Sequence, residues 1–243
     1  MSWPGFCKLR QGAARAHVAS GWGQVRVADR ARPSARLTER RRHLGVLVNP
    51  EDALLRPARL YGAEDVRRRE CPIPAVPGVY GWYFASPPSL VPLEGCYRWN
   101  GLILLYVGIS PKAPPTNGRP PSRQTIRSRI RYHYRGNAAG STLRLTLGSL
   151  LAEDLGIGLR RVGSGNRLTF GRDGEKRLSA WMAEHAQVVW TPAEQPWTLE
   201  EELIRSRVLP LNLDQNRNGS FHGQLSALRA AQRAQARLLP VER

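Results

Sequence analysis

The sequence predicts an α+β domain in which a small central three-stranded sheet is flanked by helices. Two observations carry this prediction. Residues 78–84 and 102–109 are dense in β-branched and aromatic residues, which is typical of strands. Segments after them, such as 122–137, repeat apolar residues at helical spacing. A basic N-terminal extension precedes this domain, and an Ala-rich C-terminal helix at about 224–239 follows it.

Four parts are expected along the chain: a basic, flexible arm at 1–44, a linker with short helices at 45–76, the main domain at 77–213 and a helical tail at 214–243. The first 44 residues are rich in Arg, Ala and Gly and show little hydrophobic periodicity, so we expect no packed core there. An organellar transit peptide and an over-long start are the alternatives for this segment. Pro72, Pro74 and Pro77 then favour an extended approach to the first strand.

The Pro- and Gly-rich residues 85–101 predict a long excursion between the first two strands and not a tight turn. A second Pro-rich loop, up to residue 121, precedes the helix at 122–137, where Ile126, Ile130 and Tyr134 recur at i, i+4 and i+8. The next predicted elements are a helix at 143–155, a hairpin at 159–170, a helix at 175–184 and a third strand at 186–190.

A capping-box pattern, Thr198-Leu-Glu-Glu201, then predicts the start of a helix that runs toward Pro210.

The composition favours a polyanionic partner. The net charge is +18 and the sequence pI is about 11.2, so nucleic acid is the first expectation and an acidic membrane surface the second. We find no apolar run long enough to span a membrane. Cys7, Cys71 and Cys96 are odd in number and widely spaced, which indicates neither a disulfide framework nor a metal knuckle and fits a reducing, cytoplasmic location.

A set of residues suited to phosphodiester hydrolysis follows the predicted elements in order. Cleavage needs an activated water, a cation that neutralises charge in the transition state, and a proton source for the leaving oxygen. Gly78-Val-Tyr80 and Tyr106-Val-Gly108 lie on the first two strands. Arg129 and His133 share one face of the next helix. Glu200 lies on a later helix and Asn212 lies just past its end.

These elements, in this order, resemble the GIY-YIG nuclease family over residues 76–213. The name motifs correspond to Gly78-Val79-Tyr80 and Tyr106-Val107-Gly108. The resemblance implies a metal-dependent endonuclease with one Mg²⁺ or Mn²⁺ on Glu200, Arg129 followed four residues later by His133, and Asn212 completing the site. The long excursion between the motifs, the Pro-rich loop and the added hairpin depart from the family pattern. They leave open whether cleavage is sequence-specific, structure-specific or nonspecific.

Glu200 is chosen from three adjacent glutamates by its place on the helix. At about 100° per residue it falls in the middle of an apolar arc formed by Leu199, Leu203, Ile204 and Val208. A carboxylate there needs a cation or a partner. Glu201 is explained by the capping box and Glu202 by solvent. The alternative for Glu200 is a partly buried carboxylate held by the helix dipole.

Each other candidate has a structural alternative. Tyr80 is expected to position or deprotonate the attacking water with support from Tyr106, although both are core aromatics by strand position alone. Arg129 is expected to clamp the scissile phosphate. His133 assists the water or the leaving group, or packs as a structural histidine. Asn212 anchors a phosphate or a backbone carbonyl, or caps a helix end. Gly78 and Gly108 allow close backbone approach, or mark strand twist.

Arginines around the predicted site helix are dense enough to form a phosphate-binding face. They are Arg119, Arg123, Arg127, Arg131 and Arg135. The tail carries a second stripe, Arg229, Arg233 and Arg237, which we interpret as a solvated helix face. The expected partner is nucleic acid, with DNA favoured over RNA. The alternatives are a binding module on the same scaffold without turnover and an RNA-associated basic protein.

Overall fold

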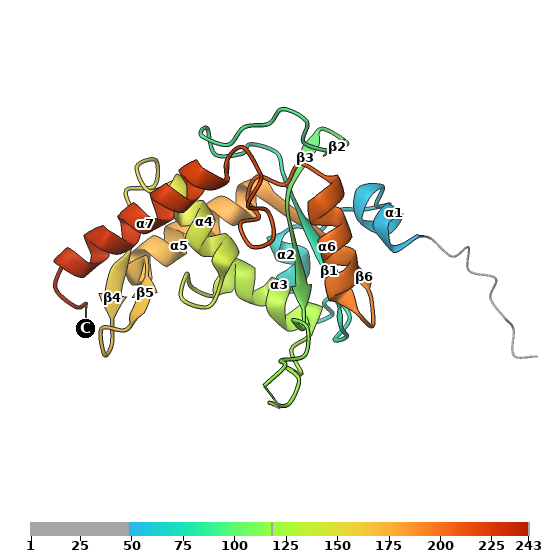
Figure 1. Ribbon diagram of the computed structural model, residues 1–243, viewed down its shortest axis with the longest axis horizontal. Coiled ribbons are helices and arrows are strands. Elements are labelled where there is room, and N and C mark those ends of the chain that lie inside the picture. Colours follow the sequence, from blue (N-terminus) through green and yellow to red (C-terminus); the bar gives the residue numbers. More distant parts are fainter. Residues whose placement is uncertain (1–48, 118, 243) are drawn as a thin grey trace, which may run out of the picture. The chain divides into compact units, whose positions relative to one another are not determined.

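A computed structural model describes residues 49–117 and 119–242 of the 243-residue chain (Figure 1). The predicted basic arm at 1–44 lies outside the described residues. The described residues belong to one compact unit. None of their helices has the length and apolar character needed to cross a membrane.

The central sheet is antiparallel and has the strand order β2, β3, β1, β6. The strands are β1 (Gly78–Phe84), β2 (Arg98–Trp99), β3 (Leu102–Ser110) and β6 (Ala186–Pro192). Every residue of β1 is buried, because neighbouring strands cover both of its edges and helices cover both of its faces. The three predicted strands correspond to β1, β3 and β6 and are confirmed, and β1 lies between β3 and β6.

The sheet has four strands, so the prediction of three was wrong in this detail. The missed strand, β2, forms a tight hairpin with β3, in which Trp99 faces Leu102. Asn100 and Gly101 make the turn with φ of 49° and 79°. Two positive φ values are what a two-residue hairpin of the right twist requires, and Asn-Gly is its strongest sequence signal. The predicted excursion at 85–101 therefore contains a tight turn at its end.

Helices cover the two faces of the sheet with separate apolar clusters. Tyr80 and Trp82 of β1 point into a cluster with helices α3 (Ile126–Arg135) and α5 (Gly171–His185). Val79 and Tyr83 point the opposite way, toward α1 (Pro50–Leu55) and α6 (Pro196–Ser206). The alternation follows from the period of two along a strand. It brings α3 and α6 to opposite faces of the strands that carry the two motifs.

The remaining elements extend the fold beyond the sheet. They are α2 (Ala63–Arg67), α4 (Thr142–Leu150), the hairpin β4 (Arg160–Val162) and β5 (Arg167–Thr169), and α7 (His222–Leu238). The predicted hairpin and tail helix are confirmed. In Figure 1, α7 runs along α4 and reaches β4. Leu225 and Ala236 of α7 are buried in this packing.

Two helix starts differ from the sequence prediction. Helix α6 begins at Pro196, and its N-cap residue Gln195 makes no side-chain hydrogen bond to the helix. Thr198 therefore lies inside the first turn and is not the N-cap. The predicted capping box at Thr198 was wrong. Proline at the first helical position fixes the start, because its φ suits a helix and its missing N–H is not needed there. Helix α3 begins at Ile126 and not at 122, because Thr125 is its N-cap and accepts a hydrogen bond from the Ser128 N–H.

Candidate active site

Side chains from β1, β3, α3 and α6 meet at one cleft of about 810 Å³. Tyr80, Tyr106, Arg129, Glu200 and Asn212 all line it. These residues are far apart in sequence, and the fold brings them together because β1 and β3 are paired while α3 and α6 pack beside them. Five of the predicted site residues therefore share one cavity.

The two motifs are matched across the sheet. Tyr80 lies directly opposite Gly108, and Tyr106 lies opposite Trp82, so both tyrosines are on the same face. A Cβ at Gly108 would approach the Tyr80 phenol oxygen to 2.7 Å and its ring carbon Cζ to 2.8 Å, which real side chains do not tolerate. Glycine at 108 is therefore what allows the Tyr80 ring to lie across β3 and reach the cleft.

Gly78 lies where the opposite edge of β1 packs against β6. A Cβ there would meet the carbonyl oxygen of Thr191 on β6 at 2.3 Å. Gly78 pairs with Pro192 on one side and with Ser110 on the other, and it does not line the cleft. Its part is to let β6 approach β1 closely.

A buried hydrogen-bonded chain stands behind Tyr80. The Tyr80 hydroxyl lies 2.9 Å from His133 Nε2, and His133 Nδ1 lies 2.7 Å from Ser141 Oγ. The Ser141 oxygen also accepts a hydrogen bond from the Arg144 N–H as the N-cap of α4. His133 is 0% exposed and does not line the cleft, so it can act on a ligand only through Tyr80. Direct assistance to water or leaving group, one of the roles considered for it, does not fit this position.

Protonation of this chain follows from burial. Burial raises the pKa of the Tyr80 phenol well above 10, with Tyr106 adding to the rise and Arg129 opposing it. Burial lowers the pKa of His133 well below its usual range, and the charges of Arg129 and Arg144 lower it further. Both side chains are consequently neutral near pH 7. A neutral imidazole has one donor and one acceptor nitrogen. If His133 accepts from Tyr80 it therefore donates to Ser141, and if it donates to Tyr80 it accepts from Ser141.

Tyr106, which also lines the cleft, is likewise a neutral phenol. Burial raises the pKa of its phenol, while the Thr142 side chain and Arg129 oppose the rise. The ring of Tyr106 lies edge-on to His133 with centroids 6.3 Å apart. Tyr106 therefore stays a neutral hydrogen-bonding group beside Tyr80.

Arg129 is held in place by the backbone and keeps donors free for a ligand. Its Nη1 donates to the Gly140 carbonyl at 2.7 Å, while the side chain is only partly buried and lines the cleft. A guanidinium has five N–H donors, so this single contact orients it and leaves the others available. The arrangement suits a planar, two-pronged contact with a phosphate.

A buried ion pair missed by the sequence analysis supports the end of α3. Arg144 is 0% exposed and pairs with Glu175 of α5 at 2.6 Å. It also donates to the carbonyl of His133 at 3.0 Å, in the last turn of α3. Helix ends leave carbonyls without partners, and Arg144 supplies a donor there. A lone arginine in the apolar run Leu143-Arg-Leu145 was the signal that could have indicated a buried partner.

Glu200 lies on the second turn of α6 beside the buried Leu203 and Ile204, as the helical wheel predicts. Val208, also placed on that arc, lies beyond the helix end and is 47% exposed. Burial raises the pKa of the Glu200 carboxyl from its ordinary 4.5 to about 7, with Lys112 opposing the rise and Asp214 adding to it. None of the ion pairs among the described residues includes Glu200.

The donor set at Glu200 fits a hard divalent cation. A partly buried carboxylate without a protein cation as its partner gains most from a metal ion, and Mg²⁺ binds through one or two carboxylates and keeps several waters. Asp214 lines the same cleft and is close enough to raise the Glu200 pKa. No group of three or more His, Cys, Asp or Glu residues suited to a metal occurs in the described residues.

Asn212 is used by the backbone of β3. Its Oδ1 accepts from the Val107 N–H at 3.0 Å and its Nδ2 donates to the Val107 carbonyl at 2.9 Å. The side chain thus imitates a strand neighbour at the outer edge of β3, midway between Tyr106 and Gly108. Of the roles considered for Asn212, the backbone anchor fits these contacts.

The five arginines predicted as a phosphate-binding face do not line the cleft. Arg127 and Arg131 donate to the carbonyls of Ile73 and Val66, on the side of α3 that faces the 66–73 segment. They lie about 160° around the helix from Arg129, which explains why they point away from it. Arg119, Arg123 and Arg135 are exposed and outside the cleft. The cations that line it besides Arg129 are Lys112 and, from α7, Arg229 and Arg233.

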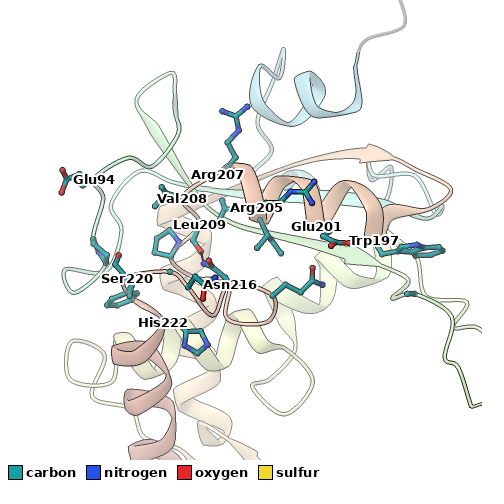
Figure 2. A pocket seen from close by; sticks show the side chains of 18 residues that line it. Glu94, Trp197, Glu201, Arg205, Arg207, Val208, Leu209, Asn216, Ser220 and His222 are labelled. Atoms are coloured by element: carbon teal, nitrogen blue, oxygen red, sulfur yellow. Dashed lines mark hydrogen bonds between the residues drawn. The ribbon is translucent and has the colours of Figure 1, made fainter.

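A larger hollow of about 1020 Å³ adjoins the cleft and shares Ala113, Trp197, Ile204 and Gln215 with it. Figure 2 shows its side chains, which come from α6, from the segment after α6, from the start of α7 and from the loops that carry Glu94 and Ala113. None of the predicted catalytic residues lines it. The smaller cleft therefore holds the candidate chemistry.

Comparison with known proteins gives one match. A family model described as the GIY-YIG catalytic domain matches residues 78–231. This span includes the two strands, the helices α3 and α6, and most of α7. No curated protein and no solved structure matches the chain.

Proposed function

The chain belongs to the GIY-YIG family of nuclease domains, and from this membership we propose that it is a metal-dependent endonuclease that cleaves DNA in preference to RNA. Its substrate is nucleic acid, as a nuclease domain implies. Cytoplasmic action is part of the proposal, since Cys71 and Cys96 are free thiols.

The observation that carries the proposal is the convergence of Tyr80, Tyr106, Arg129 and Glu200 on one cleft. Tyr80, with Tyr106 beside it, serves the attacking water, Arg129 binds the phosphate, and Glu200 would hold the cation. A scaffold that only binds nucleic acid has no use for a partly buried carboxylate without a cation beside two neutral phenols. The cleft also carries a net positive lining, which favours a phosphate.

Glu200 is the residue that would hold Mg²⁺ or Mn²⁺, with Asp214 beside it. When bound there, such an ion supplies positive charge to the phosphate oxygens and stabilises the charge that develops in the transition state. Arg129 binds a non-bridging oxygen of the same phosphate through the donors not used by Gly140. Glu200 with its cation and the Arg129 guanidinium thus approach the phosphate from α6 and from α3.

Tyr80 orients the attacking water. Its neutral hydroxyl donates to His133 Nε2, which leaves the phenol oxygen free to accept a hydrogen from water in the cleft. As the bond from the water to phosphorus forms, the water proton passes to the Tyr80 oxygen and the phenol proton passes to His133 Nε2. The P–O bond of the leaving strand breaks in the same step, and its oxygen takes a proton from solvent water in the open cleft. Ser141 accepts the hydrogen on Nδ1 of the resulting imidazolium.

Cleavage of labelled single-stranded, duplex and branched DNA and RNA, with Mg²⁺ or Mn²⁺, tests the proposal. We expect cleavage by the wild type and none by Glu200→Ala. Tyr80→Phe is expected to lose at least 100-fold in kcat, because it keeps the ring and removes the hydroxyl. Tyr83→Phe is the matched control, since its hydroxyl donates to the Leu54 carbonyl on the other face of the sheet.

Three results contradict the proposal or a part of it. Binding of nucleic acid without cleavage of any substrate, by a folded wild-type protein, assigns the chain to a binding module. Cleavage that survives in Glu200→Ala places the chemistry elsewhere. Equal losses in Tyr80→Phe and Tyr83→Phe attribute the effect to folding and not to the water.

A further inference from the structure

Helix α7 contributes two arginines to the catalytic cleft. Arg229 and Arg233 line it together with Tyr80, Arg129 and Glu200, although they lie about 100 residues after Arg129 in the sequence. The same two arginines line a neighbouring hollow of about 590 Å³ formed with Leu213, Asp214, Arg217 and His222. The two hollows share residues 213–215 as well, so they form one groove that leaves the cleft along α7.

The packing of α7 explains why these arginines face the groove. One face of α7 is packed against the rest of the protein, and Leu225 and Ala236 are the buried residues on it. The Gln232 side chain accepts a hydrogen bond from the Leu159 N–H. A stripe at i, i+4 and i+8 turns by about 40° at each step. Arg229 and Arg233 therefore lie partly buried at the border of the packed face, whereas Arg237 has turned into solvent. The solvated-face interpretation holds for Arg237 and is wrong for the other two.

Arg229 carries a charge that the fold does not pair. Its Nε is buried and has no hydrogen-bond partner among the described residues, and none of their ion pairs includes it. Burial and the neighbouring Arg233 lower its pKa, while Asp214 and Tyr106 oppose this. An unpaired, partly buried guanidinium destabilises a protein by itself. A group of this kind lowers stability in the free protein and is useful when a ligand supplies the missing anion.

We infer that Arg229 and Arg233 form a binding site for the sugar-phosphate backbone of the substrate strand, next to the scissile phosphate. The inference rests on the proposed nuclease function. The two residues are one helical turn apart, about 6 Å along α7, which is close to the spacing of successive phosphates in an extended strand. With the scissile phosphate at Arg129 and Glu200, the strand leaves the cleft along the groove, past Arg217 and His222. Among the residues that line the neighbouring hollow of about 590 Å³, Asp214 is the one acidic side chain.

Binding measured without cleavage tests the site. Fluorescence anisotropy of a labelled oligonucleotide is recorded in EDTA, as single strand and as duplex, at several salt concentrations. Arg229→Met and Arg233→Met each keep the aliphatic stem and helix propensity and remove the charge. We expect each to raise Kd about tenfold and to reduce the salt slope by about 0.7 to 0.9, the value of one phosphate contact. Arg237→Met removes the same charge from the same helix and is expected to change Kd less than twofold.

Thermal unfolding separates a binding role from a structural one. Arg229→Met is expected to keep or raise the Tm of the free protein, because it removes an unpaired buried charge. A Tm lowered by several degrees in both Arg229→Met and Arg233→Met overturns the inference. So does an equal rise of Kd in all three variants, which attributes the effect to net charge. A wild type that binds with this pattern but never cleaves contradicts the proposed function alone.

Discussion

Replacing Glu200 by glutamine is expected to stabilise the metal-free protein at alkaline pH. The carboxyl has a pKa of about 7 in the folded protein and an ordinary value of 4.5, so the folded state binds its proton more tightly than the unfolded state does. Stability therefore falls as pH rises from about 4.5 to 7, and the full cost of the buried charge is present above pH 7. Glutamine has the same shape and no charge, so it removes this cost.

The size of the effect follows from the same pKa. A difference between 4.5 and about 7 corresponds to about 3 kcal/mol. Glu200 is only partly buried, and solvent screening reduces the figure, so we expect about 1.5 kcal/mol. For a chain of this size that is a rise in Tm of about 3 to 6 °C at pH 8.5. Near pH 5 most of the difference between the wild type and Glu200→Gln disappears.

Thermal unfolding in EDTA at pH 5 and pH 8.5 measures the difference, with Glu202→Gln as the matched control. Glu202 is an exposed residue of the same helix, and its replacement is expected to leave Tm unchanged at both pH values. Addition of Mg²⁺ at pH 8.5 is expected to raise the Tm of the wild type and not of Glu200→Gln, because the proposed metal site needs the carboxylate.

Three results refute this reasoning. A lower Tm of Glu200→Gln at pH 8.5 means that the carboxylate is stabilised by the protein without a cation. An equal gain at both pH values means that its charge is not the cause. Equal stabilisation of wild type and variant by Mg²⁺ places the ion elsewhere.

Three further predictions concern the scaffold. Gly108→Ala forces the Tyr80 ring to move and is expected to lower kcat at least 100-fold, whereas Gly223→Ala, with nothing near its Cβ, keeps wild-type cleavage. Arg144→Ala leaves a buried carboxylate unpaired and is expected to cost about 3 to 5 kcal/mol in urea unfolding, and a loss under 1 kcal/mol contradicts the buried pair. Asn212→Ala removes both hydrogen bonds to β3 and is expected to cost about 1 to 3 kcal/mol, and loss of cleavage without loss of stability indicates substrate contact.

The parts of the fold that local sequence determines were predicted. The strands β1 and β3 are runs of apolar and aromatic residues, and such runs form buried strands wherever helices cover both faces. The existence of β2 was also within reach, because Asn100-Gly101 is a local hairpin signal. It was missed because the surrounding Pro and Gly residues dominate the composition of that stretch.

The arrangement of the candidate site could be predicted only where it follows from spacing along one helix, and not where it depends on tertiary packing. Spacing along a helix places Glu200 beside Leu203, and the structure agrees. Spacing cannot show that His133 lies behind Tyr80, because that depends on how α3 packs against β1. It likewise cannot show that Arg229 lines the same cleft as Arg129, which lies 100 residues earlier in the chain. Side chains supplied by tertiary packing carry no local signal, and charge density alone favoured the arginines of α3 over those of α7.

The contacts of Asn212 also bear on how the protein behaves at high concentration. Beyond β2, the outer edge of β3 offers backbone groups to which a strand of another molecule could add, which is how many β proteins aggregate. The segment that carries Asn212 occupies this edge, through its side chain at Val107 and through the Leu211 N–H, which donates to the Leu105 carbonyl at 3.1 Å. The stretch of chain that lines the candidate cleft through Leu211 and Asn212 thus also occupies an edge of the sheet with which a strand of another molecule would otherwise pair.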